Sequence, residues 1–308
     1  MIDQLMAKLS VLIIHGGAGP IKKGEYPRYQ EGVESVLRAV SPALAEGASA
    51  VDAVERAVML LEEHPQFNAG IGSALREDGS VRMDASIMDG SRFICGAVGC
   101  VRNLLHPVCL ARRVMEATPH ILLVGEEANA FARAQGFEEV PEERLITARR
   151  RERWKKEKAR RMSARRMDRR QGASTGTVGA VALDREGKLA AATSTGGSSF
   201  SHSARVGDTA IIGAGTFADE IAAVSATGLG EPMIKVNLCR SCAVLIRDGL
   251  APQRAAEEAL ALLAKRTGHS AGLIVIDAQG RIGVAYNTKR MAYGRFAPSE
   301  GIVLPPLV

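Results

Sequence analysis

Aromatic residues and long apolar runs are both scarce in this sequence. Phe, Tyr and Trp make up 4% of the 308 residues, and Trp occurs once, so the core must rest on Val, Ile, Leu and Ala. No uncharged stretch approaches the roughly 20 apolar residues that a helix needs to cross a bilayer. The N-terminus has no basic segment followed by an apolar core and a cleavage site. We therefore expect no signal peptide, no membrane contact and a cytoplasmic protein.

Cysteines are few, and their spacing suits neither a disulfide framework nor a metal site. There are five, an odd number, and only Cys239 and Cys242 form a C-x-x-C pair. A zinc site needs four ligands, and a redox pair needs a thioredoxin-like context. We interpret both residues as buried thiols on a helix face. H-E-x-x-H, P-loop and EF-hand patterns are also missing, and the six histidines are scattered.

Positive charge is concentrated in one segment. From Arg149 to Arg170, thirteen Lys or Arg stand against three acids, whereas the net charge of the whole chain is +6; the rest of the chain is therefore acidic. Such a segment buries too little apolar surface to order itself strongly. A basic helix is one interpretation, but we favour a mobile tail over residues 147–176. Its basic density suits weak phosphate contact, but without a recognisable nucleic-acid module we expect no specific nucleic-acid partner.

Apolar spacing predicts strands in adjacent pairs and helices in adjacent pairs. Such an order favours antiparallel pairing and layered α and β elements over a strict βαβ alternation. We expect one domain, residues 1–308, with Gly47 at a helix C-cap. Helices are predicted at 29–46, 49–63, 106–117, 126–134, 232–248 and 251–265. Strands are predicted at 9–14, 81–88, 93–101, 177–183, 189–195, 210–215, 221–227, 271–276 and 281–287.

Two motif matches lack the structural context that their chemistry needs. Residues 172–176 fit G-x-S-x-G with Ser174 as the nucleophile, but that motif follows a strand and opens a helix. Here a basic run precedes it and an apolar strand follows. Residues 213–218 fit the dinucleotide fingerprint G-x-G-x-x-G/A, which requires a full helix and a second parallel strand. Another strand-like run follows instead, so we interpret this segment as a glycine-rich turn in a hairpin.

Thr177 stands between glycines, after the basic segment and before an apolar run. An internal threonine is unreactive because its hydroxyl needs a base in order to attack a carbonyl. Cleavage just before Thr177 would free an α-amine with an unperturbed pKa of roughly 8, which an enzyme could tune toward neutrality. One residue would then supply both the nucleophile and the base. A polar loop leading into an ordinary strand is the plainer interpretation of this motif alone.

Three further segments carry residue types that fit the same chemistry. Residues 193–197 end the next predicted strand with hydroxyls that could orient a nucleophile. Arg205 and Asp208 could hold the carboxylate and the ammonium of an α-amino acid, although alone they would more often be a surface ion pair. The segment 227–230 offers the Thr227 hydroxyl and approachable backbone N–H groups, which suit an oxyanion.

Seven short motifs, combined, strongly resemble the plant-type asparaginase and isoaspartyl peptidase family. The resemblance covers nearly the whole chain, from about Val11 to Asn287, in the family's order. Within the family the chain is similar to the animal members that have both activities. The motifs are His15-Gly16-Gly17-Ala18-Gly19, Phe67-Asn68-Ala69-Gly70-Ile71-Gly72-Ser73, Met83-Asp84-Ala85-Ser86-Ile87-Met88-Asp89-Gly90, Gly176-Thr177-Val178-Gly179-Ala180-Val181, Thr193-Ser194-Thr195-Gly196-Gly197, Gly207-Asp208 and Thr227-Gly228-Leu229-Gly230-Glu231.

The resemblance implies a self-processing N-terminal nucleophile hydrolase of the α+β class, with a four-layered αββα sandwich. The precursor would cut itself between Gly176 and Thr177 into an α chain of residues 1–176 and a β chain of residues 177–308. Both chains would stay in one folded unit, and two such units would pair into a dimer. The implied reactions are hydrolysis of L-asparagine to L-aspartate and ammonia, and cleavage of isoaspartyl (β-aspartyl) dipeptides.

The resemblance also implies a role for each matching residue. Thr177 is the implied nucleophile, and Thr195 lies near it and assists self-cleavage. Thr227 and the backbone of Gly228 would form the oxyanion hole. Asn68 would lie with Gly176 at the cleavage site. Arg205 and Asp208 would hold the substrate's charged ends, within a binding segment made of Arg205, Val206, Gly207, Asp208, Thr227, Gly228, Leu229 and Gly230.

No cofactor is required by this scheme, although relatives bind sodium through the backbone carbonyls of one loop. The matching carbonyls would be those of Leu61, Glu62, His64, Phe67, Ala69 and Ile71.

Two positions depart from the family pattern. Ser225-Ala226 precedes Thr227 where many relatives have a second threonine, which could weaken a hydroxyl network. Leu229 replaces a residue that is often polar or His, which could shift the preference for substrate side chains.

Two rival interpretations remain. One keeps the fold but makes the chain a glycosylasparaginase-like enzyme or a threonine protease; the former would favour an Asp-Thr cleavage site and a secretory signal. The other is a binding protein that uses its basic segment on nucleic acid or an acidic partner while the site stays silent.

Overall fold

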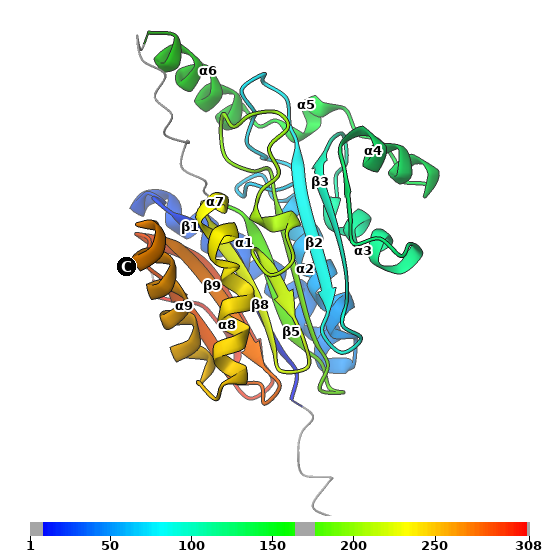
Figure 1. The fold of residues 1–308 in the computed structure, drawn as a ribbon, viewed down its shortest axis with the longest axis vertical. Coiled ribbons are helices and arrows are strands. Elements are labelled where there is room, and N and C mark those ends of the chain that lie inside the picture. Colours follow the sequence, from blue (N-terminus) through cyan, green and yellow to red (C-terminus); the bar gives the residue numbers. More distant parts are fainter. Residues whose placement is uncertain (1–8, 164–175, 307–308) are drawn as a thin grey trace, which may run out of the picture.

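Strand β1 (Val11–Gly19) shows how the alternation of side chains builds two cores. Leu12 and Ile14 are buried in one apolar cluster, whereas Val11 and Ile13 are buried in another on the opposite face. A strand that is apolar on both faces must be covered on both sides. In the computed structural model, which describes residues 9–163 and 176–306, helices cover one face of this strand's sheet and a second sheet covers the other (Figure 1).

The sheet that contains β1 is mostly antiparallel and carries β5, which begins two residues after Gly176. Its order in the described residues is β12-β11-β1-β5-β6-β2-β3-β4, and only β3 and β4 pair in parallel. The other strands are β2 (Met83–Asp89), β3 (Ile94–Val101), β4 (Leu122–Val124), β5 (Val178–Leu183), β6 (Leu189–Thr195), β11 (Arg290–Ala297) and β12 (Gly301–Val303).

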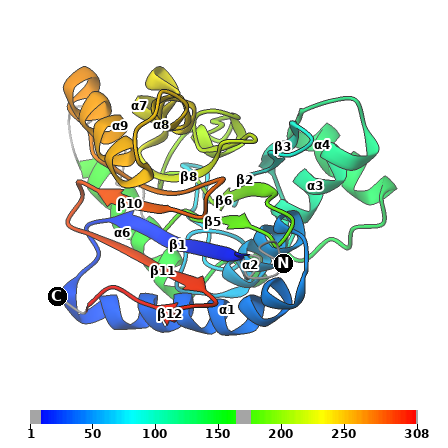
Figure 2. The ribbon, with the colours of Figure 1, turned by 90° about the horizontal axis from the view of Figure 1, so that it is seen from below.

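The second sheet packs on the first and is antiparallel throughout. Its order is β10-β9-β8-β7. The strands are β7 (Thr216–Ala218), β8 (Ala222–Gly228), β9 (Ala271–Asp277) and β10 (Ile282–Tyr286). The two sheets lie face to face in the middle of the molecule (Figure 2).

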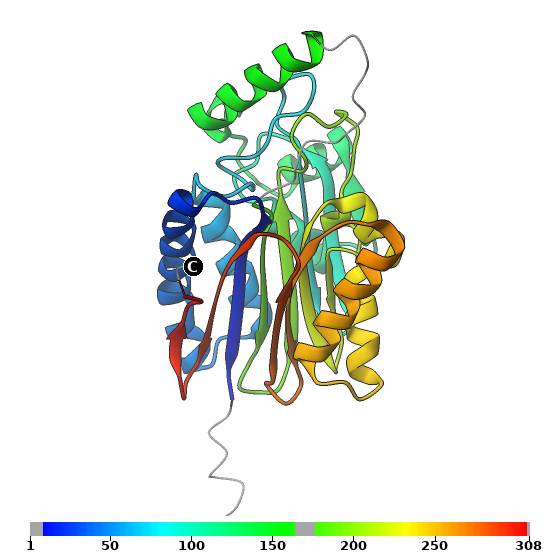
Figure 3. The ribbon, with the colours of Figure 1, turned by 90° about the vertical axis from the view of Figure 1, so that its left-hand side faces the viewer.

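Helices form the two outer layers. One layer comprises α1 (Tyr26–Glu46), α2 (Ala50–Glu63) and α3 (Pro107–Ala117), and the other comprises α7 (Gly230–Val236), α8 (Leu238–Arg247) and α9 (Pro252–Thr267). Figure 3 shows the order helix, sheet, sheet, helix from one side of the molecule to the other. The predicted αββα sandwich is therefore confirmed. Short helices α4 (Gly125–Ala134) and α5 (Glu142–Leu145) lead to α6 (Ala148–Ser163).

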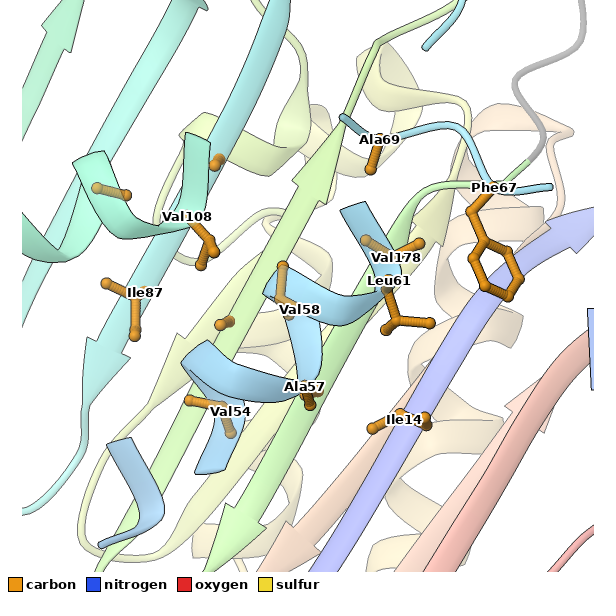
Figure 4. Packing of buried hydrophobic residues seen from close by; sticks show 14 of the residues in the cluster. Ile14, Val54, Ala57, Val58, Leu61, Phe67, Ala69, Ile87, Val108 and Val178 are labelled. Atoms are coloured by element: carbon orange, nitrogen blue, oxygen red, sulfur yellow. The ribbon is translucent and has the colours of Figure 1, made fainter. Parts of the chain in front are cut away.

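Helix α2 illustrates how local sequence fixes an element of the outer layer. Ser49 caps its N-terminus and accepts the N–H of Asp52 at 3.1 Å. Gly47 ends the preceding helix with a φ of 120°, as predicted, because this backbone region suits glycine. The apolar face of α2 then packs on the first sheet (Figure 4). Figure 4 labels Val54, Ala57, Val58 and Leu61 from α2, beside Ile14 and Val178 from the sheet.

Two predicted elements differ from the structure, and strands β4, β11 and β12 were not predicted. The strand expected at 210–215 is a 3-10 turn at Asp208–Ala210 followed by a glycine turn into β7. The helix expected at 232–248 is broken into α7 and α8 at Asn237, whose φ is 46°. Strands β11 and β12 were missed because their burial alternates irregularly. A hairpin is present at this point, since β7 pairs with β8, but its turn lies at 219–221 and the glycine turn at 213–215 leads into β7.

The prediction of a mobile tail is wrong over Ala148–Ser163, where helix α6 forms; residues 164–175, including Ser174, lie outside the described part of the chain. Arg, Lys, Glu and Ala are strong helix formers, and this propensity was underestimated. The indole N–H of Trp154 donates to the carbonyl of Arg76 at 2.8 Å, and Arg150 is 5% exposed. The first turns of α6 are therefore anchored to the body of the protein.

The last two points concern the C-x-x-C pair and membrane-spanning helices. Cys239 and Cys242 are buried on α8 as free thiols, and burial raises the pKa of Cys242 to about 12, which agrees with unreactive core residues. Across residues 9–163 and 176–306, no helix is long and apolar enough to span a bilayer.

Candidate active site

Thr177 lies at the start of β5, next to the end of β6. The two strands pair antiparallel, with Val178 opposite Ser194, so the residue before Val178 meets the residue after Ser194. Thr177 Oγ1 lies 3.0 Å from Thr195 Oγ1, and the two residues are 4% and 3% exposed. Thr195 Oγ1 also accepts the N–H of Gly197 at 3.1 Å. The candidate nucleophile is thus buried and held by a second hydroxyl.

The carbonyl of Gly176, just before Thr177, is held by a loop from the first half of the chain. The backbone N–H of Asn68 donates to it at 2.8 Å. Gly17 packs against it from the other side, with a φ of 104°; a Cβ on Gly17 would lie 2.3 Å from Gly176 Cα. Only glycine fits there. The predicted neighbourhood of Asn68 and Gly176 is therefore present.

Asn68 is fixed on every side. Its Oδ1 accepts the N–H of Ala74 at 2.7 Å, and its Nδ2 donates to the carbonyl of Gly197 at 2.8 Å. Its own carbonyl accepts the N–H of Gly196 at 2.8 Å. The loop that follows Thr195 and the loop that carries Asn68 are therefore locked together around Gly176.

His15 holds the carbonyl of Thr177. His15 Nδ1 lies 3.1 Å from that oxygen and Nε2 lies 2.9 Å from Ser225 Oγ. A carbonyl only accepts, so Nδ1 carries the hydrogen. Burial lowers the pKa of His15 to about 3, so the ring is neutral, and Nε2 accepts from the Ser225 hydroxyl.

A chain of buried hydroxyls continues from Ser225 into the second sheet. Ser225 Oγ lies 2.7 Å from Thr193 Oγ1, which accepts from Thr216 at 2.6 Å. Thr216 in turn accepts from Ser86 Oγ at 2.7 Å. Ser225 thus takes part in the hydroxyl network through both His15 and Thr193. The network is therefore intact in this chain, although Ser225-Ala226 departs from the family pattern.

Thr227 is the penultimate residue of β8 and lies close to the glycine loop of β1. Its Oγ1 accepts the N–H of Ala18 at 3.2 Å, and the residue is 1% exposed. That bond uses an oxygen lone pair and leaves the hydroxyl hydrogen to donate elsewhere. Because Ala18 follows Gly17, which touches Gly176, the Thr227 hydroxyl lies on the Thr177 side of the site.

Arg205, Asp208 and Gly230 form a second cluster. A Cβ on Gly230 would lie 2.4 Å from Arg205 Nη2 and 2.6 Å from Asp208 Oδ1, so a glycine is required at this point. Arg205 Nε and Nη2 donate to Glu231 at 2.9 and 3.1 Å. Within the described residues, Nη1 makes no hydrogen bond and lies toward Gly207.

Asp208 carries a buried carboxylate oxygen with no partner. Its Oδ2 is buried and accepts no hydrogen bond among the described residues, and the residue is 6% exposed. Burial raises its pKa to about 7, although the nearby Arg205 guanidinium opposes the rise. An unpaired buried carboxylate is costly, and it is the group that an ammonium ligand would satisfy.

Asp84 joins the two clusters. Its register partner in β6 is Thr195, while its carboxylate accepts the N–H of Gly207 at 2.8 Å and that of Cys100 at 2.9 Å. The loop with Arg205 and Asp208 is thereby fixed to the sheet beside the candidate nucleophile.

Two residues of the predicted binding segment, Val206 and Leu229, lie at the edge of the cluster formed by Arg205, Asp208 and Gly230. The side chain of Val206 packs toward Gly99, since a Cβ on that glycine would lie 3.1 Å from it. Val206 therefore faces strand β3 rather than Asp208. Leu229 precedes α7 with an extended backbone and is partly exposed.

The loop matched to sodium binding is largely satisfied by the protein itself. Leu61 and Glu62 carbonyls accept the N–H groups of His64 and Ile71 at 3.3 and 2.7 Å. The His64 carbonyl accepts the N–H of Phe67 at 3.2 Å. The Phe67 carbonyl accepts from Arg150 Nη2 at 3.3 Å. Four of the six carbonyls thus accept one hydrogen bond each, and the buried Arg150 guanidinium opposes a cation at the Phe67 oxygen.

Sequence reasoning assigned no role to His15, Asp84 or Glu231, although each stands within a quoted motif. The available signals were a histidine ending an apolar run and acids within a predicted strand or directly after Gly230. Their partners lie 26 to 210 residues away, so spacing alone could not identify them.

Comparison with known proteins agrees with the geometry. The model of the asparaginase family Asparaginase_2 matches residues 8–301. The chain is 44% identical over 284 residues to the isoaspartyl peptidase/L-asparaginase of Xenopus laevis, with 92% of this chain and 91% of the relative covered. It is 45% identical over 310 residues to the plant-type L-asparaginase of Pyrococcus abyssi, covering 94% and 99%. The human isoaspartyl peptidase/L-asparaginase is 46% identical over 272 residues, covering 88% and 87%.

Proposed function

The chain belongs to the asparaginase family, and from this premise we propose that it is a self-processing threonine amide hydrolase. Its substrates would be L-asparagine, giving L-aspartate and ammonia, and β-aspartyl dipeptides. One observation carries the proposal: Thr177 Oγ1 lies 3.0 Å from Thr195 Oγ1, while the carbonyl just before Thr177 accepts the N–H of Asn68. A nucleophile, its hydroxyl partner and a polarised carbonyl are therefore adjacent.

Self-cleavage comes first in this proposal. Thr177 Oγ1 attacks the Gly176 carbonyl carbon, and the negative charge that develops on the Gly176 oxygen is stabilised by the N–H of Asn68. The C–N bond breaks, and the proton lost by the hydroxyl goes to the Thr177 nitrogen. Water then hydrolyses the resulting ester. The products are a Gly176 carboxylate, a free Thr177 hydroxyl and a free α-amine, so the α chain is residues 1–176 and the β chain residues 177–308.

Turnover then uses the freed amine. The amine accepts the Thr177 hydroxyl proton while Oγ1 attacks the side-chain amide carbon of asparagine. Thr227, whose hydrogen is left available by its bond from Ala18, donates to the new oxyanion together with the N–H of Gly228. Ammonia leaves with the transferred proton, and water hydrolyses the β-aspartyl ester to aspartate. A β-aspartyl dipeptide follows the same course with an amino acid as leaving group.

Recognition of the substrate rests on the second cluster. Asp208 Oδ2, which accepts no hydrogen bond among the described residues, is suited to the α-ammonium, which supplies hydrogen bonds to it in a buried site. Arg205 would approach the α-carboxylate through Nη1, because Glu231 occupies Nε and Nη2. Leu229 and Gly230 border this site. Because Val206 faces β3, we assign it a packing role and no direct contact.

The remaining expectations stay predictions. We predict pairing of two αβ units, a cytoplasmic location and no specific nucleic-acid partner. A sodium ion at the loop of Leu61–Ile71 also stays a prediction. No step of the mechanism uses it.

The two rivals differ in what they require. A glycosylasparaginase-like enzyme or a threonine protease would use the same Thr177 on a substrate without a free α-carboxylate or α-ammonium. A binding protein would need only the basic surface of α6, with salt-sensitive affinity and no hydrolysis. The buried carboxylate of Asp208 favours the amino-acid substrate.

Assays with two substrates separate these options. We expect the purified, matured protein to release ammonia and L-aspartate from L-asparagine, and the Thr177→Ala variant to release neither. N-acetyl-L-asparagine, which has no ammonium for Asp208, should be a poor substrate. Equal hydrolysis of asparagine and its N-acetyl form would contradict the assignment of Asp208 and favour a rival of the same fold.

A further inference from the structure

Arg150 is a buried cation that the mechanism above does not use. It lies in the first turn of α6 and is 5% exposed. Its Nε donates to the carbonyl of Gly72, and its Nη2 to that of Phe67 at 3.3 Å. Within the described part of the chain, no ion pair joins it to a carboxylate. Burial and the neighbouring Arg149 and Arg153 lower its pKa to about 9, so the charge is kept at neutral pH at a cost in solvation.

The loop that Arg150 contacts is the one that carries Asn68. Arg149 Nη2 donates to the carbonyl of Gln66 at 2.7 Å, and the Gly72 N–H donates to Leu145 at 2.8 Å. The segment around the start of α6 therefore ties this loop along its outer side. On its inner side, the N–H of Asn68 meets the carbonyl of Gly176.

The Phe67 carbonyl and the Asn68 N–H belong to one planar peptide group. Arg150 donates to the oxygen of that group at 3.3 Å, and the nitrogen of the same group donates to Gly176 at 2.8 Å. A donor on the carbonyl withdraws electron density from the amide, so hydrogen bonds in such a chain strengthen one another. A positive charge is thus aligned, through one peptide, with the carbonyl that Thr177 would attack.

We propose that Arg150 is a positioning residue for self-cleavage: it orients and polarises the Phe67–Asn68 peptide, whose N–H stabilises the developing negative charge on Gly176. The inference rests on the proposed self-processing and extends it to helix α6. The basic segment is accordingly needed at its beginning for maturation, whereas the mature enzyme, whose scissile bond is already broken, no longer depends on this charge.

Three variants test this assignment. Arg150→Met removes the donors and keeps a long side chain, Arg150→Lys keeps a charge that reaches one carbonyl, and Lys155→Met removes an exposed charge from the same helix as the matched control. Precursor decay is followed by denaturing gel and intact mass, and turnover is measured per matured site.

We expect maturation to slow at least about tenfold in Arg150→Met, since misplacement of a reacting group costs one to two orders of magnitude. Arg150→Lys should be intermediate, Lys155→Met unchanged, and turnover per matured site within about twofold of wild type.

Amide hydrogen exchange gives a readout that does not require cleavage. In a Thr177→Ala precursor, adding Arg150→Met should speed exchange at Asn68 at least about tenfold, with the Lys155→Met pair as control, because the N–H loses its aligned partner. Unchanged exchange would overturn the proposal. Equal maturation rates of wild type and Arg150→Met would also overturn it. So would a fall in turnover per matured site as large as the fall in maturation rate, together with a lower melting temperature, because that result marks an ordinary structural residue. A wild-type chain that never cleaves would contradict the proposed function itself, and this inference with it.

Discussion

Arg205 and Glu231 form a two-point ion pair in which Nε and Nη2 lie 2.9 and 3.1 Å from the two carboxylate oxygens. The pair fixes the plane of the guanidinium, and the side chain of Arg205 is 12% exposed. A planar fork held in this way presents its remaining edge in one orientation. The acid that completes the site was quoted in the sequence motif but was not given a function there.

This relationship predicts an unequal effect of two conservative changes. Arg205→Lys keeps the charge but loses the fork, so kcat/KM for L-asparagine should fall about 100-fold, or about 2–3 kcal/mol. Glu231→Gln keeps the shape and loosens the orientation, and we expect a smaller loss, about tenfold, mainly in KM. Steady-state kinetics on fully matured enzyme decide the matter. An Arg205→Lys enzyme within threefold of wild type would show that the fork does not hold the substrate.

Asp208 predicts opposite pH effects on activity and on stability. Its carboxylate must be charged to bind an ammonium, and burial raises its pKa to about 7; kcat/KM should therefore fall about tenfold per pH unit below this value. Because the folded pKa lies above the unfolded value, the contribution of this group to stability is full below about pH 4 and is lost as the pH rises through 7. The ionised form is thus the destabilising one.

Asp208→Asn tests the effect on stability and the need for the charge. It should lose activity because it cannot bind the ammonium as an anion, and its melting temperature should lie above that of wild type at pH 8 and close to wild type near pH 4. Thermal melts at the two pH values give the comparison. A variant that is less stable than wild type at pH 8 would mean that the Asp208 charge is satisfied within the folded protein.

His15 predicts a loss of stability in acid. Its pKa is lowered to about 3 by burial, whereas it is near 6.5 in an unfolded chain. The unfolded state therefore binds more protons between these values, and stability is lost as the pH falls from about 6.5 toward 3. His15→Gln keeps a donor and an acceptor but does not titrate. Its melting temperature should fall less steeply than that of wild type over this range; equal slopes would show that the ring titrates normally.

The fold and the candidate site were predictable to different extents. The apolar run of β1 and the helical spacing of apolar residues in α2 are local patterns, so these elements and the layered class could be predicted. Asn237, with its left-handed backbone, splits a helix that apolar spacing alone joins. The basic helix α6 was missed because its anchors, Arg150 and Trp154, contact backbone carbonyls of the segment 67–76, which no spacing along the chain reveals.

The residues of the candidate site also divide into those that short motifs indicate and those that only the packing of distant segments brings together. Thr177, Thr195 and Asp208 stood out in short motifs in which each lies directly beside a glycine, and Asn68 stood out in a motif with Gly70 two residues later. His15 could not, since its partners Thr177 and Ser225 come together only when β1, β5 and β8 pack. Sequence patterns indicate residue types, whereas these contacts depend on the packing of two sheets.

Intact-mass and N-terminal analysis of the purified chain tests the central claim most directly. The 32.7 kDa precursor should convert into two pieces of about 19 and 14 kDa, by proportion to length, and the smaller should begin at Thr177. Amidase activity should appear in step with that new N-terminus, and the Thr177→Ala chain should stay whole and inactive under the same conditions. An intact wild-type chain that hydrolyses L-asparagine, or a cut at any other bond, would contradict the account.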